Sequence, residues 1–382
     1  MPLPRLSFDS RTLRYLYERK RRSLEREHGL RLAEYDNFFD NDEFFHKYHP
    51  YDGPGGYLAC LERLAERFPK LITLDFSQTS TEGRVIPVAR VCASRSTREH
   101  TFWINSLIHA PEFIGGEVNL GILRKLIEGY IRDDSIFNTA EFFFTPVLNP
   151  DGFVRNIENV HHLEFKLGRY NPRGVDLNRN FDDNFAKRSW INKVKRLFGF
   201  DLEYAGKHPF SERETQFVRA FVEKIEPSAV VSLHSYFGTI LYPPWSSQEE
   251  DPWMKELAEN MGKAMQEPYD AVPGSRFLEY VAGSPLASIL GKLATKIRHP
   301  TIEGSLDGWL YQQGIPSMLL EISRPPTLEL ALFGHLPIYN PPPSSIPFHV
   351  ENCYSAVRQF MEDIIASVNL TSPRHTVPRT DY

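Results

Sequence analysis

Cysteine is scarce in this chain of 382 residues, which contains only Cys60, Cys92 and Cys353. No two of them form a Cys-x-x-Cys pair, so the sequence offers neither a disulfide framework nor a zinc site built from thiolates alone. A metal bound by this chain would therefore need histidine and carboxylate ligands.

Long hydrophobic runs are also missing. No stretch of about 18 charge-free apolar residues could form a membrane span, and the first 30 residues contain no apolar signal-peptide core. We therefore expect a cytoplasmic protein without a membrane span. The basic residues of 11–31 resemble a mitochondrial presequence, but Glu18, Glu25 and Glu27 argue against one because presequences are poor in acids.

Neither sign of charge dominates the composition. The 44 Lys and Arg residues and 49 Asp and Glu residues give a net charge of −5. Proteins that bind nucleic acids usually have a basic domain or stripe, so we expect no nucleic-acid partner.

Strand patterns alternate with helix patterns from about residue 48 onward. The strand patterns cover 71–76, 85–91, 101–108, 140–148, 229–234 and 317–322. The helix patterns cover 58–68, 117–131, 212–224, 252–266, 285–296 and 350–367. This alternation predicts an α/β sandwich around a mostly parallel or mixed sheet.

The domain organisation follows from the same pattern. No repeat or linker interrupts residues 48–368, which predicts one domain over that range. A charged extension precedes it at 1–47, basic first and then acidic. The tail at 369–382 has no apolar face to bury and is expected to be disordered.

Histidine and glutamate residues at strand ends are the candidate metal ligands. His109 and Glu112 directly follow a strand pattern, and one helical turn or tight loop would aim both at one point. His234 ends another strand pattern and is the candidate third ligand, although an isolated histidine can also be a satisfied core residue. A second pair with the same spacing, His161 and Glu164, lies in an irregular stretch and is a weaker candidate.

Polar residues in and beside apolar segments suggest further roles. Glu321 lies inside an apolar strand pattern, where a carboxylate is either paired or functional. Beside a metal-activated water it could accept a proton and pass it to a leaving amine. Asp176 could accept the second ring N–H of a ligand histidine. Asn178 and Arg179 are donors suited to a carboxylate, unless the segment is only a charged surface turn.

Together these segments resemble the zinc metallocarboxypeptidases, the clan of carboxypeptidases A, B and E with their bacterial and cytosolic relatives. The resemblance covers residues 48–368, with HAPE, NPDGF, GRYNPRGVDLNRNF, SLHSY, GSLDGWLYQQGIPS and LLEIS in family order. It implies a three-layer α/β/α sandwich with a mixed sheet of about eight strands. It also implies one zinc ion per chain and hydrolysis of the C-terminal bond of peptides or proteins.

The resemblance assigns a role to each candidate residue. The implied zinc ligands are two histidines and a glutamate: His109, Glu112 and His234. Glu321 matches the catalytic glutamate, and Arg169 matches the arginine that polarises the scissile carbonyl. Asn178 and Arg179 match the anchors for the terminal carboxylate of the substrate. Asp176 matches the acid that orients the first zinc histidine.

Three features bear on substrate binding. His299 stands where the family has a mobile tyrosine that closes over the substrate, which implies lower affinity but intact chemistry. Leu306 occupies the position where an acid selects Lys or Arg, and so implies apolar or aromatic C-terminal residues. The basic stretch 187–196 has no family counterpart; we interpret it as a solvated insertion, with a rim that attracts acidic peptides as the alternative.

Other functions stay open at this point. They are removal of glutamate from acidic tails, cleavage of bacterial cell-wall amides, and peptide binding by a pseudoenzyme. Only His299 favours a pseudoenzyme, whereas the intact ligand set and Glu321 oppose it. The 47 residues before the domain are too few for the folded pro-domain of digestive members, so we expect an active protein, working as a monomer.

Overall fold

The computed structural model describes residues 47–161, 167–185, 204–245, 250–277, 279–280, 302–324 and 340–369. Within these residues, eight strands form one sheet in the order β1-β2-β4-β3-β5-β8-β6-β7. The strands are β1 (Ile72–Asp75), β2 (Val88–Val91), β3 (His100–Ser106), β4 (Ala140–Thr145), β5 (Ala229–Ser235), β6 (Thr239–Tyr242), β7 (Asp270–Pro273) and β8 (Ser317–Ile322).

The sheet is mixed, with a parallel centre. β4, β3, β5 and β8 run parallel to one another. The antiparallel pairs are β1 with β2, β2 with β4, and β6 with β8. The carboxyl ends of β3, β5 and β8 therefore meet at one edge of the sheet, where ligands collect in α/β folds.

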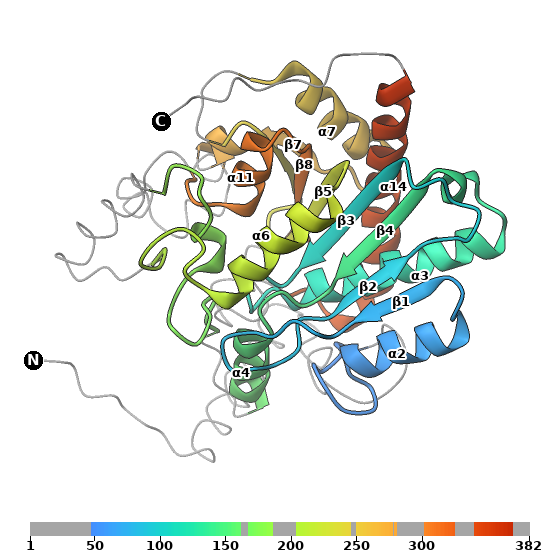
Figure 1. Cartoon of the computed structure of the whole chain (residues 1–382). Coiled ribbons are helices and arrows are strands. Elements are labelled where there is room, and N and C mark those ends of the chain that lie inside the picture. The colour runs from blue at the N-terminus through green and yellow to red at the C-terminus, as the bar shows by residue number, and fades with distance from the viewer. Residues whose placement is uncertain are drawn as a thin grey trace, which may run out of the picture.

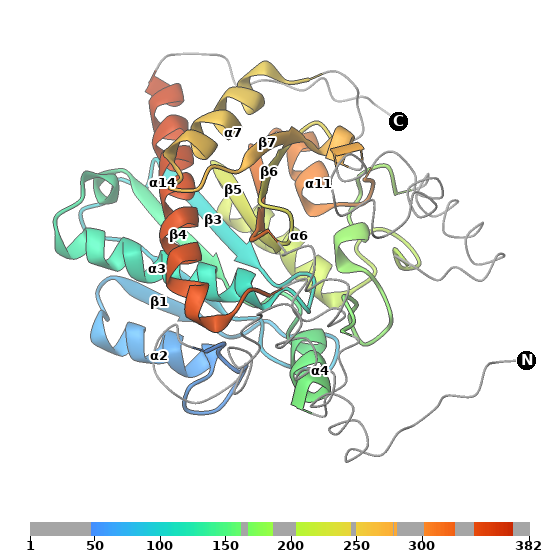
Figure 2. The ribbon, with the colours of Figure 1, turned by 180° about the vertical axis from the view of Figure 1, so that it is seen from behind.

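Helices cover both faces of the sheet. Figure 1 shows α6 and α11 in front of it, and Figure 2 shows α2, α3, α7 and α14 on the opposite face. The principal helices are α2 (Tyr57–Arg67), α3 (Phe113–Ile131), α4 (Pro150–His161), α6 (Arg213–Ile225), α7 (Pro252–Ala264), α11 (Leu306–Gln312) and α14 (Ile346–Asn369). This arrangement confirms the predicted three-layer sandwich with a mixed eight-stranded sheet.

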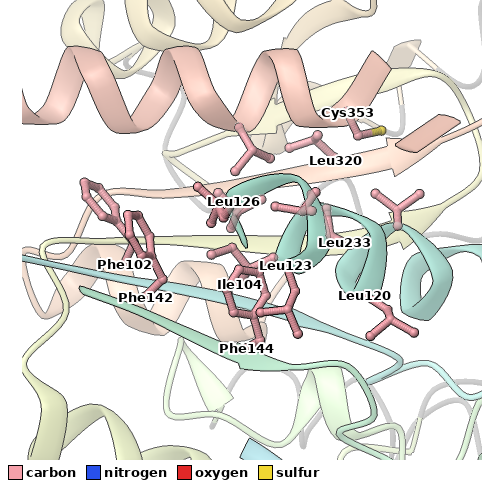
Figure 3. Packing of buried hydrophobic residues seen from close by; sticks show 14 of the residues in the cluster. Phe102, Ile104, Leu120, Leu123, Leu126, Phe142, Phe144, Leu233, Leu320 and Cys353 are labelled. Carbon is pink, nitrogen blue, oxygen red and sulfur yellow. The ribbon is translucent and has the colours of Figure 1, made fainter. Parts of the chain in front are cut away.

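The larger core lies between the sheet and α3, α7 and α14. Successive strand residues point to opposite faces, so Ile104 of β3 packs into this core while Trp103 packs under α6 on the other face. Figure 3 shows the aromatic and aliphatic side chains of the larger core, including Phe102, Phe142 and Leu126. Both faces of the central strands are thus buried, which explains why these strands are continuous apolar runs in the sequence.

Some elements differ from the prediction. Helix α3 begins at Phe113, not at residue 117, because the glycines at 115 and 116 weaken the helical signal at its start. Helix α4 and the short strands β6 and β7 were not predicted. Each of these strands has only four residues and runs into proline, which weakens a strand pattern. The predicted helix 285–296 lies outside the described residues, as do the extension before residue 47 and the tail after 369.

Candidate metal centre

Three polar side chains converge where parallel strands end. His109 and Glu112 follow β3 in a tight turn, in which Glu112 N donates to His109 O over 3.3 Å. Glu112 is the residue directly before α3, and its side chain makes no capping hydrogen bond to the helix. His234 is the penultimate residue of β5, which pairs directly with β3. Gly115 allows α3 to approach β5, since a Cβ there would lie 2.9 Å from the carbonyl oxygen of Leu233.

The distances between these side chains fit a shared cation. His109 Nδ1 lies 2.9 Å from Glu112 Oε1 and 3.0 Å from His234 Nδ1, and His234 Nδ1 lies 3.0 Å from Glu112 Oε2. All three residues are buried, and among the described residues they form the one group of this kind with converging ligand atoms. Two imidazole nitrogens and a carboxylate oxygen are a donor set typical of a catalytic zinc site.

The charges of the site favour the metal-binding forms of these residues. Burial alone would raise the pKa of Glu112, but the imidazoles of His109 and His234 outweigh it and lower that pKa to about 2. Burial lowers the pKa of His234, against the opposing effect of Glu112. A neutral imidazole and an ionised carboxylate are the forms that coordinate a metal.

Glu321 occupies the neighbouring strand at the same level. It pairs in register with His234 across β5 and β8 and with Thr239 across β8 and β6. Its side chain is buried, and among the described residues its Oε2 has no hydrogen-bond partner. Burial and the nearby Glu112 carboxylate raise the pKa of Glu321, while Arg169 and Arg179 act in the opposite direction.

Asp176 lies behind His109 together with Arg169. Asp176 Oδ1 is 3.4 Å from His109 Nε2, and Asp176 Oδ2 forms an ion pair with Arg169 Nε at 2.9 Å. Arg169 Nη2 also lies 2.6 Å from His109 Nε2. Burial alone would raise the pKa of Asp176, but Arg169 and Arg179 lower it well below its usual value. Asp176 is therefore a buried partner of the histidine whose ionised form is favoured by the two arginines.

Asn178 and Arg179 are in the short turn η3 (Leu177–Arg179), which Asp176 caps by accepting from Asn178 N. Both side chains are buried. Asn178 Oδ1 accepts from the backbone N–H of Leu306 over 2.8 Å, which fixes the orientation of the amide. The amide NH₂ is then the group of Asn178 that can donate to a carboxylate.

Of the residues predicted to govern substrate specificity, Leu306 is among the described residues and His299 is not. Leu306 begins α11 and is buried in the apolar cluster that also contains Leu177 and Phe181. His299, the basic stretch 187–196 and Glu164 lie outside the described residues. The structure therefore leaves the predictions made for them untested.

Sequence reasoning missed several buried polar residues that brace the site. Asn340 accepts from Ile114 N over 3.1 Å and donates to Pro111 O over 2.7 Å, and so holds the chain on both sides of Glu112. Asp307 accepts from Ser232, two residues before His234, over 3.1 Å. These contacts join segments far apart in the sequence, and an isolated Asn or Asp carries no local pattern that reveals them.

Comparison with known proteins agrees with this geometry. The zinc carboxypeptidase family matches residues 57–355. The chain belongs to the zinc carboxypeptidase family. It is 26% identical to carboxypeptidase A4 of Mus musculus over 326 residues, which cover 83% of this chain and 70% of that protein. It is 28% identical to carboxypeptidase A1 of Bos taurus over 267 residues, covering 67% of this chain and 58% of that protein.

Solved structures support the fold of this family member. Carboxypeptidase A from Helicoverpa armigera superposes with a TM-score of 0.68 at 19% identity, covering 94% of this chain and 82% of that one. Bovine thrombin-activatable fibrinolysis inhibitor superposes with a TM-score of 0.64 at 21% identity, covering 85% and 100%. The predicted resemblance is thus confirmed. In the described part of the chain, none of the helices combines the length and apolar character needed to cross a membrane.

Proposed function

We propose that this zinc carboxypeptidase family member hydrolyses the C-terminal peptide bond of peptides or proteins. The supporting observation is one arrangement: three converging ligand atoms from His109, Glu112 and His234, with the buried carboxylate of Glu321 in register beside them. A metallohydrolase needs such an open metal site next to a general base.

Bound zinc would supply Lewis-acid polarisation of the carbonyl and a lowered pKa for a water molecule. Glu321 accepts a proton from the attacking water and returns it to the leaving amine. The raised pKa of Glu321 favours uptake of a proton, which the group then gives back to the leaving amine.

The other polar residues bind and orient the substrate. Asn178, with its amide fixed by Leu306, and Arg179 hold the terminal carboxylate of the peptide. Arg169 lies between His109 and Asp176 with about a quarter of its side chain exposed. We assign this guanidinium to stabilising the negative charge that develops on the carbonyl oxygen.

Metal removal tests the proposed reaction. The purified chain should cleave N-acylated dipeptides that end in a free carboxylate, lose this activity after treatment with a chelator, and regain it with one equivalent of zinc. A protein that binds one zinc ion but cleaves no member of a broad C-terminal library would contradict the proposal and favour the peptide-binding pseudoenzyme.

The preferred C-terminal residue is a separate part of the proposal. Leu306 offers no charge to pair with a basic side chain, so we expect apolar or aromatic ends to be removed fastest. The same library decides the matter, because best cleavage of Lys or Arg ends would contradict this preference. Best cleavage of Glu ends would instead favour the removal of acidic residues.

A further inference from the structure

Asp307 is a buried acid that the proposed reaction does not use. It lies in the first turn of α11 with a fully buried side chain. Its Oδ1 accepts from the hydroxyl of Ser232 over 3.1 Å. Ser232 and His234 are two residues apart on β5 and therefore point to the same face of the sheet.

The start of α11 is also joined to the residues that bind the substrate carboxylate. Leu306, the residue before Asp307, donates its backbone N–H to Asn178 Oδ1 over 2.8 Å. Phe181 N donates to Gly304 O over 3.1 Å. Gly304 has φ +74°, and a Cβ there would collide with the carbonyl oxygen of Arg179. The first turn of α11 thus lies between β5 and the Asn178–Arg179 turn.

The buried surroundings of Asp307 disfavour the ionised form of its side chain. Among the described residues no ion pair involves Asp307, and its Oδ2 has no hydrogen-bond partner. Burial raises its pKa to about 7, despite the opposing hydrogen bond from Ser232. Asp176, the residue directly before the turn η3, has an equally buried side chain, but it forms an ion pair with Arg169. A buried carboxylate without a cation destabilises a fold, so its presence calls for a role that an apolar residue could not fill.

We propose that Asp307 is a positioning residue that sets the distance between the metal centre and the group that binds the substrate carboxylate. Its side chain fixes α11 to β5 through Ser232, and the adjacent N–H fixes α11 to Asn178. The identity of the carboxylate rests on the proposed function. Correct placement matters because a shift of about 1 Å can cost on the order of 10²-fold in rate.

Three variants of the full-length, zinc-loaded chain test this role. They are Asp307→Ala, Ser232→Ala and Asp307→Asn, each made in a Glu321→Gln background so that the peptide is cleaved far more slowly during the measurement. Calorimetry gives the Kd of an N-acetylated dipeptide with a free carboxylate and of the same dipeptide with a terminal amide. The readout is the ratio of the two Kd values, which reports recognition of the carboxylate apart from general loss of fold.

Losing the Ser232–Asp307 bond should weaken carboxylate recognition selectively. We expect Asp307→Ala and Ser232→Ala each to reduce the preference for the carboxylate about tenfold, with one zinc per chain retained. Asp307→Asn keeps an oxygen that can accept from Ser232, and should keep the preference within about threefold. A double variant that combines Asp307→Ala with Ser232→Ala should lose no more of the preference than either single variant, because both substitutions remove the same bond.

Asp134→Asn is the matched control. Asp134 binds Arg358 near the carboxyl end of α3, whereas Glu112 is at the amino end of this helix of 19 residues. The Asp134→Asn variant should therefore leave the ratio of the two Kd values unchanged. An unchanged ratio in folded, zinc-loaded Ser232→Ala and Asp307→Ala would overturn the positioning role. If Asp307→Ala does not fold, the ratio measured for Ser232→Ala alone supports or overturns that role.

The outcome is separable from that of the proposed function. A wild-type chain that cleaves no peptide, combined with a reduced carboxylate preference in Asp307→Ala, would refute the reaction and keep the positioning role. Normal cleavage by the wild type, combined with unchanged Kd ratios in Asp307→Ala and Ser232→Ala, would support the reaction and refute the positioning role.

Discussion

Glu112 and Glu321 are two buried glutamates of one site with opposite electrostatic behaviour. Glu112 lies between two imidazoles, within 3.0 Å of a ring nitrogen on each side, and its pKa is lowered to about 2. Glu321 is buried beside Glu112 itself, which helps to raise its pKa. The same side chain is thus held ionised in one position and protonatable in the other.

Burial raises the pKa of both carboxylates, and the difference shows that their partners decide whether this effect is reinforced, as at Glu321, or outweighed, as at Glu112. A carboxylate held ionised between imidazoles is suited to binding a cation. A carboxylate next to another negative charge, with an oxygen that lacks a hydrogen-bond partner among the described residues, is suited to taking up a proton. This contrast supports the proposal that Glu112 binds the metal and Glu321 transfers the proton.

The largest effect is expected from Glu112→Gln. The variant keeps the size of the side chain but removes the negative charge between His109 and His234. Zinc affinity should fall more than about 100-fold, beyond the loss typical of residues that only support a ligand. Zinc titration with a competing chelator measures this, and activity should be restored in part by excess zinc. Wild-type zinc affinity in this variant would remove Glu112 from the ligand set.

A smaller effect on the metal is expected from Asp176→Asn. The change removes the charged partner of His109 Nε2 and leaves Arg169 without its carboxylate. Zinc affinity should fall about 10- to 100-fold. Asp183→Asn is the matched control, because this second buried aspartate of the same segment contacts Ser305 and Gln312 instead. Equal losses in both variants would mean that the effect is a general one on the fold.

Much of this centre could be predicted from the sequence, because His109, Glu112 and His234 follow or end apolar strands and Glu321 interrupts one. Their meeting follows from the parallel pairing of β3, β5 and β8. The bracing by Asn340 and the Ser232–Asp307 bond could not be predicted, since they depend on how distant segments pack. Helix α3 was predicted too short because two glycines at its start serve close packing, Gly115 on Leu233 of β5 and Gly116 on Tyr57.

The smallest predicted effect is on the stability of the fold. It extends the comparison of Glu112 and Glu321 to Asp183, a buried acid with no proposed role in catalysis. Burial raises the pKa of Asp183 to about 7 from 3.8, against its hydrogen bonds from Ser305. The folded state then holds a proton that the unfolded state releases, so this group stabilises the fold at low pH and its contribution is lost as pH rises from about 4 to 7. The slope is at most about 1.4 kcal/mol per pH unit.

Denaturant unfolding of Asp183→Asn at several pH values measures this contribution. Between about pH 4 and 7 the slope of the variant should be less negative than that of the wild type by up to about 1.4 kcal/mol per pH unit; Asp307, whose pKa is also raised to about 7, keeps its own share of the slope. The exposed neighbour Asp182 provides the control, and Asp182→Asn should follow the wild-type curve. Identical curves for wild type and Asp183→Asn would show that Asp183 ionises normally, and that burial in this segment has a weaker effect than the comparison of the two glutamates assumes.

The most direct measurement is the zinc content and turnover of Glu321→Gln. The substitution preserves shape but removes the group assigned to proton transfer, while the ligand atoms of His109, Glu112 and His234 stay in place. We predict one zinc per chain and a turnover lower by about 10²- to 10⁴-fold, the contribution typical of a general acid and base. Wild-type turnover in the zinc-loaded variant would contradict the assignment of Glu321.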